Sequence, residues 1–292
     1  MPRILLIGSK GQLGQYLFDV FTSNNHYELI CLARSELDLS QANEIGDAIR
    51  LVNPDLVINA TAYTAVDNAE EQQELAFSIN ATAPEMMAKA CEGLSIPFVH
   101  FSTDYVFSGD AETPYKEIDE PDPQGVYGAS KLAGEKAILA SECEAYIFRT
   151  AWVYSQRGNN FYKSMLRLAV DRSELGIVSD QFGSPTYASS IANAVVVVVE
   201  KILDKGVSKE TGIYHMTCSG TTNWSGFAKA IFSSKNVDII VNEITTSDYP
   251  TPAKRPAYSV LDNSKLLRNF GVRLPNWQDA LDTCVAETSQ QK

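Results

Sequence analysis

Short apolar runs alternate with helix-like stretches along the first half of the chain. The runs at residues 3–7, 29–32, 56–60, 98–101 and 146–150 show no polar alternation, which is typical of strands buried on both faces of a parallel sheet. Between them, segments 43–52 and 70–92 have the length and composition of helices. Strands that alternate with helices predict right-handed crossover units, and therefore an α/β fold with a doubly wound parallel sheet.

The pattern changes after residue 154, where loops rich in Gly, Asn, Ser and Pro become frequent. We expect a smaller C-terminal substrate-binding lobe formed by residues 154–187 and 218–292. Residues 188–217 are expected to return to the sheet domain formed by residues 1–153. The valine run at 195–199 is far shorter than the roughly 20 residues of a membrane span, so it predicts a buried helix or strand.

Three glycines directly follow the first predicted strand. Gly8, Gly11 and Gly14 lie between that strand and apolar positions with helical spacing, so the turn joins a strand to a helix. The amides of Gly11, Gln12 and Leu13 would then point from the helix N-terminus at a diphosphate. This arrangement predicts a Rossmann-like dinucleotide site, although a glycine-rich turn without a ligand has the same spacing.

The end of the second predicted strand bears on the choice of cofactor. Arg34 lies there, and no carboxylate precedes it. An arginine suits a 2′-phosphate, whereas an acidic residue would hold a ribose hydroxyl. We therefore predict NADPH in preference to NADH; the alternative is that Arg34 is an ordinary surface residue.

A second group of residues suggests proton transfer. Tyr127 and Lys131 are four positions apart, and Thr103 follows the fourth predicted strand. On a helix the Lys131 ammonium would lie beside the phenol and lower its pKa, which would make Tyr127 a proton donor near neutral pH. Thr103 could then hydrogen-bond a substrate carbonyl. Because a Tyr-x-x-x-Lys pair is common by chance, this prediction requires the strand ends to meet in one crevice.

Composition narrows the functional classes. A formal charge of −12 without a basic cluster argues against nucleic-acid binding. Five widely spaced cysteines and three separated histidines predict reduced thiols and no metal site. The apolar stretch at the start is too short for a signal peptide, and no segment predicts a membrane span, so we expect a cytoplasmic protein.

Five further blocks accompany the glycine turn: NATAYTAVD (59–67), FSTDYVF (101–107), YGASKLAGE (127–135), FRTAWVY (148–154) and DQFGSPT (180–186). In order and spacing, nearly end to end, the chain resembles the dTDP-4-dehydrorhamnose reductase family of extended short-chain dehydrogenases/reductases. The resemblance implies reduction of the C4 ketone of dTDP-4-dehydro-β-L-rhamnose by a nicotinamide hydride, the last step of dTDP-L-rhamnose synthesis.

The resemblance also implies roles for individual residues. Tyr127 would protonate the new alkoxide, and Thr103 would hydrogen-bond the ketone oxygen. Lys131 would lower the pKa of the tyrosine and hold the nicotinamide ribose. The remaining matches fall into two sets: Ala62, Tyr63 and Thr64 beside the cofactor, and Asp104, Tyr105, Trp152 and Arg255 near the dTDP-sugar. For Trp152, a core aromatic is the alternative.

Assembly is expected to differ from that of some family members. These are described as Mg²⁺-bridged dimers held by glutamates, at positions where this chain has Tyr16 and Ser189. Since Mg²⁺ needs oxygen ligands such as carboxylates, we expect no such bridge and a monomer or weak dimer.

Other functions stay open. Related proteins dehydrate or epimerise nucleotide sugars or reduce other 4-keto sugars, and a regulatory subunit of methionine adenosyltransferase also resembles the family. Dehydratases follow the threonine with Asp-Glu, whereas Asp104 and Tyr105 follow Thr103 here, so dehydration would lack its base. An epimerase would retain NAD, which fits Arg34 poorly. The joint presence of Thr103, Tyr127 and Lys131 favours catalysis over a regulatory role.

Overall fold

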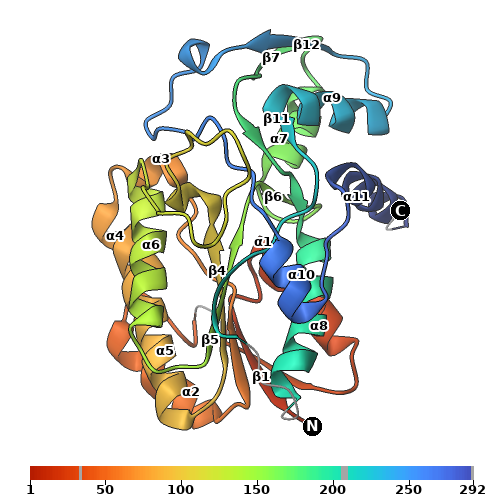
Figure 1. Ribbon diagram of the computed structural model, residues 1–292. Helices are drawn as coiled ribbons and strands as arrows, with labels where there is room; N and C mark the ends of the chain where they lie inside the picture. The colour runs from red at the N-terminus through yellow and green to blue at the C-terminus, as the bar shows by residue number, and fades with distance from the viewer. Residues whose placement is uncertain (33–34, 205–209, 291–292) are drawn as a thin grey trace.

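A six-stranded parallel sheet forms the centre of the protein (Figure 1). The computed structural model describes residues 1–32, 35–204 and 210–290. Across the sheet the strands are β2 (Glu28–Leu32), β1 (Arg3–Ile7), β3 (Leu56–Asn59), β4 (Phe98–Thr103), β5 (Ala145–Thr150) and β10 (Gly212–His215). Every neighbouring pair is parallel, which confirms the predicted doubly wound α/β fold.

Helices cover both faces of this sheet because its strands are apolar on both sides. Ile4 and Leu6 of β1 belong to the core on one face, where α1 (Gln12–Thr22) and α8 (Ala188–Leu203) pack together. Leu5 and Ile7 belong to the core on the other face, with α2 (Ala42–Val52) and α5 (Ala83–Leu94). Alternate residues of one strand thus bury their side chains in two different cores.

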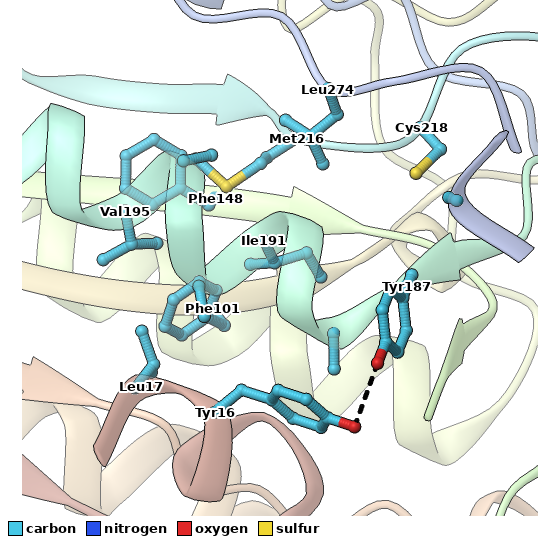
Figure 2. Close-up of a cluster of buried hydrophobic side chains, with 14 of the residues drawn as sticks. Tyr16, Leu17, Phe101, Phe148, Tyr187, Ile191, Val195, Met216, Cys218 and Leu274 are labelled. Carbon is cyan, nitrogen blue, oxygen red and sulfur yellow. Dashed lines mark hydrogen bonds between the residues drawn. The ribbon is translucent and has the colours of Figure 1, made fainter. Parts of the chain in front are cut away.

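The valine run lies inside α8. Figure 2 shows Ile191 and Val195 of this helix together with Leu17 of α1 and the sheet residues Phe101 and Phe148, all of them in one buried cluster. The prediction of a buried element is therefore confirmed. No helix in the described parts of the chain is long and apolar enough to cross a bilayer.

The helix predicted over 70–92 is confirmed for most of its length, because the chain is helical without interruption over 73–94, but it contains a widened π-helical turn that was not predicted. The chain forms α3 (Val66–Ala69), α4 (Gln73–Phe77), a π-helical turn η1 (Ser78–Thr82) and then α5. Within η1 the buried side chain of Asn80 hydrogen-bonds to both the amide and the carbonyl of Tyr63. A widened turn of this type commonly marks a functional position within a helix.

The second lobe consists of small paired strands with helices beside them (Figure 1). β7 (Glu174–Val178) pairs with β12 (Ile240–Ile244), β6 (Val153–Tyr154) with β9 (Thr186–Tyr187), and β8 (Phe182–Gly183) with β11 (Thr222–Asn223). Helices α7 (Phe161–Leu168) and α9 (Trp224–Ser234) pack together, and α11 (Trp277–Gln290) contacts α9 and β9. Helix α10 (Ser264–Phe270) falls within the range assigned to this lobe but packs against β10 and α8. The domain boundaries stay a prediction.

Candidate active site

The glycine turn brings the end of β1 very close to the start of α1. Gly8 has φ +94°, and a Cβ there would lie 2.6 Å from Cγ2 of Thr61. A Cβ on Gly14 would lie 1.9 Å from the Gly8 carbonyl oxygen. Only glycine fits at these two positions, so the backbone forms the cradle that a diphosphate requires.

The amides of this turn do not all remain available. The Gly11 amide donates to the Gly8 carbonyl at 2.9 Å, so its predicted role as an anion donor is not supported by this geometry. Gly11 caps α1 without a side-chain hydrogen bond. The amides of Gln12 and Leu13 lie in the first turn, where no intrahelical acceptor exists, so they remain the candidate donors.

The side chains of Gln12 and Leu13 hold the glycine turn in place. Gln12 Nε2 donates to the Val153 carbonyl at 3.0 Å, and Gln12 Oε1 accepts from Asn160 Nδ2 at 2.8 Å. Leu13 packs against the core. The turn is therefore linked directly to β6 and to the start of α7.

A cavity of about 220 Å³ opens beside the turn. It is lined by Gly8 and Lys10 from the turn, by Leu32 at the end of β2, and by Leu37 and Leu39. Apolar walls beside a phosphate-binding turn suit an adenine ring. Arg34, predicted to read the 2′-phosphate, lies outside the described residues.

The segment after β3 is fixed by a residue that the sequence analysis missed. Asn80 Oδ1 accepts from the Tyr63 amide at 2.8 Å, and Asn80 Nδ2 donates to the Tyr63 carbonyl at 3.0 Å. Ala62 and Thr64 flank this clamped residue in the chain. Asn80 carries no sequence signal, because its role comes from the π-helical turn that aims it at a distant loop.

Thr103 and Asp104 lie buried where β4 ends. Thr103 Oγ1 donates to Asp104 Oδ1 at 3.0 Å and accepts from the Tyr105 amide at 3.2 Å. Burial raises the pKa of Asp104 to about 6, against the lowering effect of its hydrogen bonds with Ser259 and Thr103. The carboxyl group is therefore easier to protonate than an ordinary aspartate.

Tyr127 lies in the first turn of α6 (Val126–Leu139), next to Thr103. Burial raises the pKa of Tyr127 to about 12, while its hydrogen bond with Thr103 acts in the opposite direction. Its ring meets that of Tyr105 edge-on, with centroids 5.5 Å apart. The helix approaches closely because a Cβ on Gly128 would lie only 2.2 Å from the Tyr105 carbonyl oxygen.

The position of Lys131 corrects one expectation. Its Nζ donates to the Phe101 carbonyl at 2.7 Å and lies 3.2 Å from His100 Nε2. Burial lowers the pKa of Lys131 to about 8, and the charge of Glu135 opposes this effect. Lys131 shares α6 with Tyr127 but points at the sheet, so the predicted lowering of the phenol pKa is not found in this structure.

A buried ion pair supports the same helix one turn further on. Arg149 of β5 contacts Glu135 of α6 twice, Nε to Oε1 at 2.9 Å and Nη2 to Oε2 at 2.6 Å. Both side chains are only 1% exposed. Ser102 also donates to Glu135. The pair therefore joins α6 to β4 and β5 directly behind the candidate catalytic residues.

A larger cleft of about 590 Å³ opens between this region and the second lobe. Of the predicted substrate residues, Tyr105 and Arg255 line it, together with Arg167, Arg172 and Trp224. Arg255 Nη2 pairs with Asp67 Oδ2 at 2.7 Å, while its buried Nη1 has no hydrogen-bond partner among the described residues. Arg167, Arg172 and Asp67 were not predicted, because isolated charges in sequence look like surface residues.

Trp152 occupies a special position between the two lobes. It has φ +48°, and its ring stacks on Trp224 with centroids 3.5 Å apart. A Cβ on Gly183 would lie 2.5 Å from Trp152 Cε2. The tryptophan therefore lies flat over a glycine and is held by a second aromatic ring instead of being part of a general core.

The two positions discussed for Mg²⁺ carry no carboxylate. Tyr16 is buried on α1 and its hydroxyl lies 3.2 Å from that of Tyr187 (Figure 2), while Ser189 lies in the first turn of α8. Within the described ranges, no three His, Cys, Asp or Glu side chains gather in a way that could hold a metal ion.

Comparisons with known proteins identify the family of the chain. A family profile described as the RmlD substrate binding domain matches residues 2–290. A dTDP-4-dehydrorhamnose reductase of Aggregatibacter actinomycetemcomitans is 42% identical over 96% of this chain and 97% of its own length. The crystal structure of a dTDP-4-dehydrorhamnose reductase from Clostridium acetobutylicum has a TM-score of 0.92 and 37% identity, covering 98% of this chain and 99% of that one.

A second crystal structure was determined with a cofactor bound. The dTDP-4-dehydrorhamnose reductase of Bacillus anthracis, in complex with NADP, has a TM-score of 0.91 and 34% identity over 98% of this chain and 99% of that one. Family profile, sequence and fold thus agree over nearly the full length. The chain belongs to the dTDP-4-dehydrorhamnose reductase family.

Proposed function

We propose that this protein reduces the C4 ketone of dTDP-4-dehydro-β-L-rhamnose to dTDP-β-L-rhamnose with NADPH. The observation that carries the proposal is the proximity of Thr103, at the end of β4, to Tyr127, in the first turn of α6, where the Thr103 hydroxyl acts to lower the pKa of Tyr127. The glycine turn at the end of β1 lies at the same edge of the sheet, so a cofactor and a ketone can meet there.

The roles of the residues follow from their surroundings. A nicotinamide cofactor supplies the hydride when bound. Tyr127 donates a proton to the alkoxide oxygen, and Thr103 hydrogen-bonds the same oxygen as its charge develops. Asp104 orients Thr103 through the 3.0 Å hydrogen bond. Lys131, four residues further along α6, supplies positive charge to the site from the position where its Nζ donates to the Phe101 carbonyl.

The cleft suits the rest of a nucleotide sugar. Arg255, Arg167 and Arg172 line it and bring positive charge to a diphosphate. Tyr105 and Trp224 offer aromatic surface for sugar or base. For the cofactor, Lys10 lines the cavity beside the glycine turn and, with Arg34 of the sequence, favours the 2′-phosphate of NADPH over NADH.

Tyr127→Phe tests the proposal. It should lower kcat for NADPH oxidation with the 4-keto sugar by about 10²–10⁴-fold, because the general acid is lost. Tyr27→Phe, which removes a hydroxyl far from the site, is the matched control and should keep full activity. Product analysis by NMR at C4 identifies the reduced sugar. Unchanged turnover in Tyr127→Phe would contradict the proposal.

An epimerase would behave differently in the same assay. It would convert its substrate without net loss of NADPH absorbance, whereas the reductase consumes one cofactor for each ketone reduced. We also propose a monomer or weak dimer, because Tyr16 and Ser189 offer no carboxylate for Mg²⁺. Sedimentation with and without a chelator tests this, and a tight dimer that chelator dissociates would overturn it.

A further inference from the structure

The hydrogen bonds around His100 determine which of its ring nitrogens carries the proton. Asn59 Oδ1 accepts from the Thr61 amide at 3.0 Å and from the Thr61 hydroxyl at 2.5 Å. The Thr61 amide can only donate, so the oxygen of the Asn59 side chain must face it. The nitrogen of that side chain then faces His100 Nδ1 at 3.1 Å.

This fixes the tautomer of the histidine. Asn59 Nδ2 donates, so His100 Nδ1 accepts and holds no proton. Burial strongly lowers the pKa of His100, with the charge of Lys131 acting in the same direction, so the ring is neutral. A neutral imidazole carries one proton, which must therefore be on Nε2, the atom 3.2 Å from Lys131 Nζ.

The consequence falls on Lys131. An ammonium has three donors and no acceptor, so it cannot accept the Nε2 proton; a neutral amine has the lone pair that can. The amine can still donate to the Phe101 carbonyl at 2.7 Å. We propose that His100 is a positioning residue for Lys131: the Nε2–H of His100, set by the hydrogen bond from Asn59 to Nδ1, favours the neutral amine of Lys131 over the ammonium.

Other charged groups near the pair do not supply this effect. Glu135, on the same helix as Lys131, raises the lysine pKa, and its carboxylate is already paired with Arg149. Asp104 raises the pKa of Tyr127 and hydrogen-bonds to Thr103, and neither Asp104 nor Tyr127 is among the groups that shift the pKa of Lys131. Among the described side chains, His100 is the hydrogen-bonding partner that discriminates directly between ammonium and amine.

The inference concerns the site of the proposed function, but its first test requires no activity. In cofactor-free protein, ¹⁵N NMR of the imidazole should show the His100 proton on Nε2, and ¹³Cε NMR should show Lys131 titrating near pH 8. A proton on Nδ1, or a lysine that titrates at its ordinary value of 10.5, would overturn the inference.

Two variants sharpen the test. His100→Gln places an amide near Nζ whose oxygen can accept from the ammonium, so the Lys131 pKa should rise by at least about one unit, a tenfold change in its proton affinity. His215→Gln is the matched control: His215 is also fully buried, on β10, and should leave Lys131 unchanged. Asn59→Asp should move the His100 proton to Nδ1, because a carboxylate accepts there.

The effect on catalysis rests on the proposed function. If the ammonium is needed beside Tyr127, kcat/KM should fall above about pH 8 in the wild type, and His100→Gln should move that limb up by the shift measured for Lys131. If the alkaline limb of kcat/KM stays at the same pH in His100→Gln while the pKa of Lys131 rises, the proposed link to catalysis is wrong, but the effect of His100 on Lys131 stands. Absence of any activity with the 4-keto sugar would count against the proposed function and leave the titration result intact.

Discussion

The charged residues behind β4 and those of the large cleft differ in burial and in how their charges are paired. Behind β4, Lys131, Glu135 and Arg149 are all about 1% exposed, and each has partners within the protein. In the cleft, the side chains of Arg255 and Asp67 are 19% and 38% exposed. Arg149 and Arg255 each keep one nitrogen, Nη1, without a hydrogen-bond partner among the described residues, but Arg255 lines a cleft whereas Arg149 is almost fully buried. The buried group holds the catalytic helix rigid, whereas the cleft keeps donors available for a ligand.

This difference predicts that mutations behind β4 affect stability and mutations in the cleft affect binding. The largest expected effect is that of Glu135→Gln. It leaves Arg149 buried without its counter-charge and should lower the free energy of unfolding by about 3–5 kcal/mol. Urea denaturation measures the loss.

The matched control is Glu85→Gln on the surface of α5. Glu85 pairs with Lys89 one turn away, with Nζ and Oε1 at 2.5 Å, and both side chains are partly exposed. Such pairs contribute only about 0.3–0.5 kcal/mol, so the control should be nearly neutral. Similar losses in the two variants would show that burial of the ion pair has no special weight.

The next effect depends on pH. Because the folded-state pKa of Asp104 is raised from 3.8 to about 6, its contribution to stability is fully present below pH 3.8 and is lost as pH rises through 6. Asp104→Asn keeps an acceptor for Thr103 without the charge, and should stabilise the fold by on the order of 1–3 kcal/mol at pH 7. Thermal unfolding at several pH values checks this, and the gain should vanish near pH 4. A gain that persists there would exclude charge as its cause.

Helix packing gives a prediction of similar size. Gly134→Ala should destabilise by about 1–3 kcal/mol, because its Cβ would lie 2.1 Å from the Asn80 carbonyl oxygen. Gly93→Ala, at an exposed site of α5 with nothing within 4 Å, should instead stabilise by about 0.5–1 kcal/mol. Chemical denaturation of both proteins distinguishes contact from helix propensity. The two substitutions should change the free energy of unfolding in opposite directions. If both stabilise the protein, α6 can move away from Asn80 to make room for the added Cβ.

The smallest effect is expected in the cleft. Arg255→Lys keeps the charge but loses the fork that can hold Asp67 and a diphosphate together, so KM for the sugar nucleotide should rise about tenfold, equivalent to 1.4 kcal/mol. Steady-state kinetics measures this, and the unfolding midpoint should stay constant. A lower unfolding midpoint without a change in KM would show that Arg255 has a structural role like that of the charged residues behind β4, and does not bind the substrate.

The sequence predicted what depends on local pattern. The strands β1 to β5, the glycine turn and the burial of Val195 follow from hydrophobic runs and spacing. Prediction from the sequence failed where the structure depends on contacts between residues that are far apart in the chain. The orientation of Lys131 depends on His100 of β4, which the sequence analysis considered only as one of three separated histidines. The widened turn at η1 places Asn80 where its side chain reaches Tyr63. Neither contact leaves a periodic signal.

The site was predicted in the same uneven way. Thr103 and Tyr127 meet because the end of β4 and the N-terminal turn of α6 lie at the same edge of the sheet, an arrangement that the fold class implies. Arg167 and Arg172 could not be assigned, because nothing in their neighbourhood along the chain shows that α7 and the loop after it face the cleft.

The strand order also bears on how the chain folds during synthesis. β10 pairs with β5, yet more than sixty residues, including the first segment of the smaller lobe (154–187), lie between them. Until residues 212–215 leave the ribosome, β5 presents an open edge that can pair with another chain, and long-range parallel pairing of this kind is slow. A nascent chain that stops at residue 153 therefore has the cofactor turn but an uncovered sheet. We expect this truncated chain to aggregate and not to persist as a stably folded sheet domain.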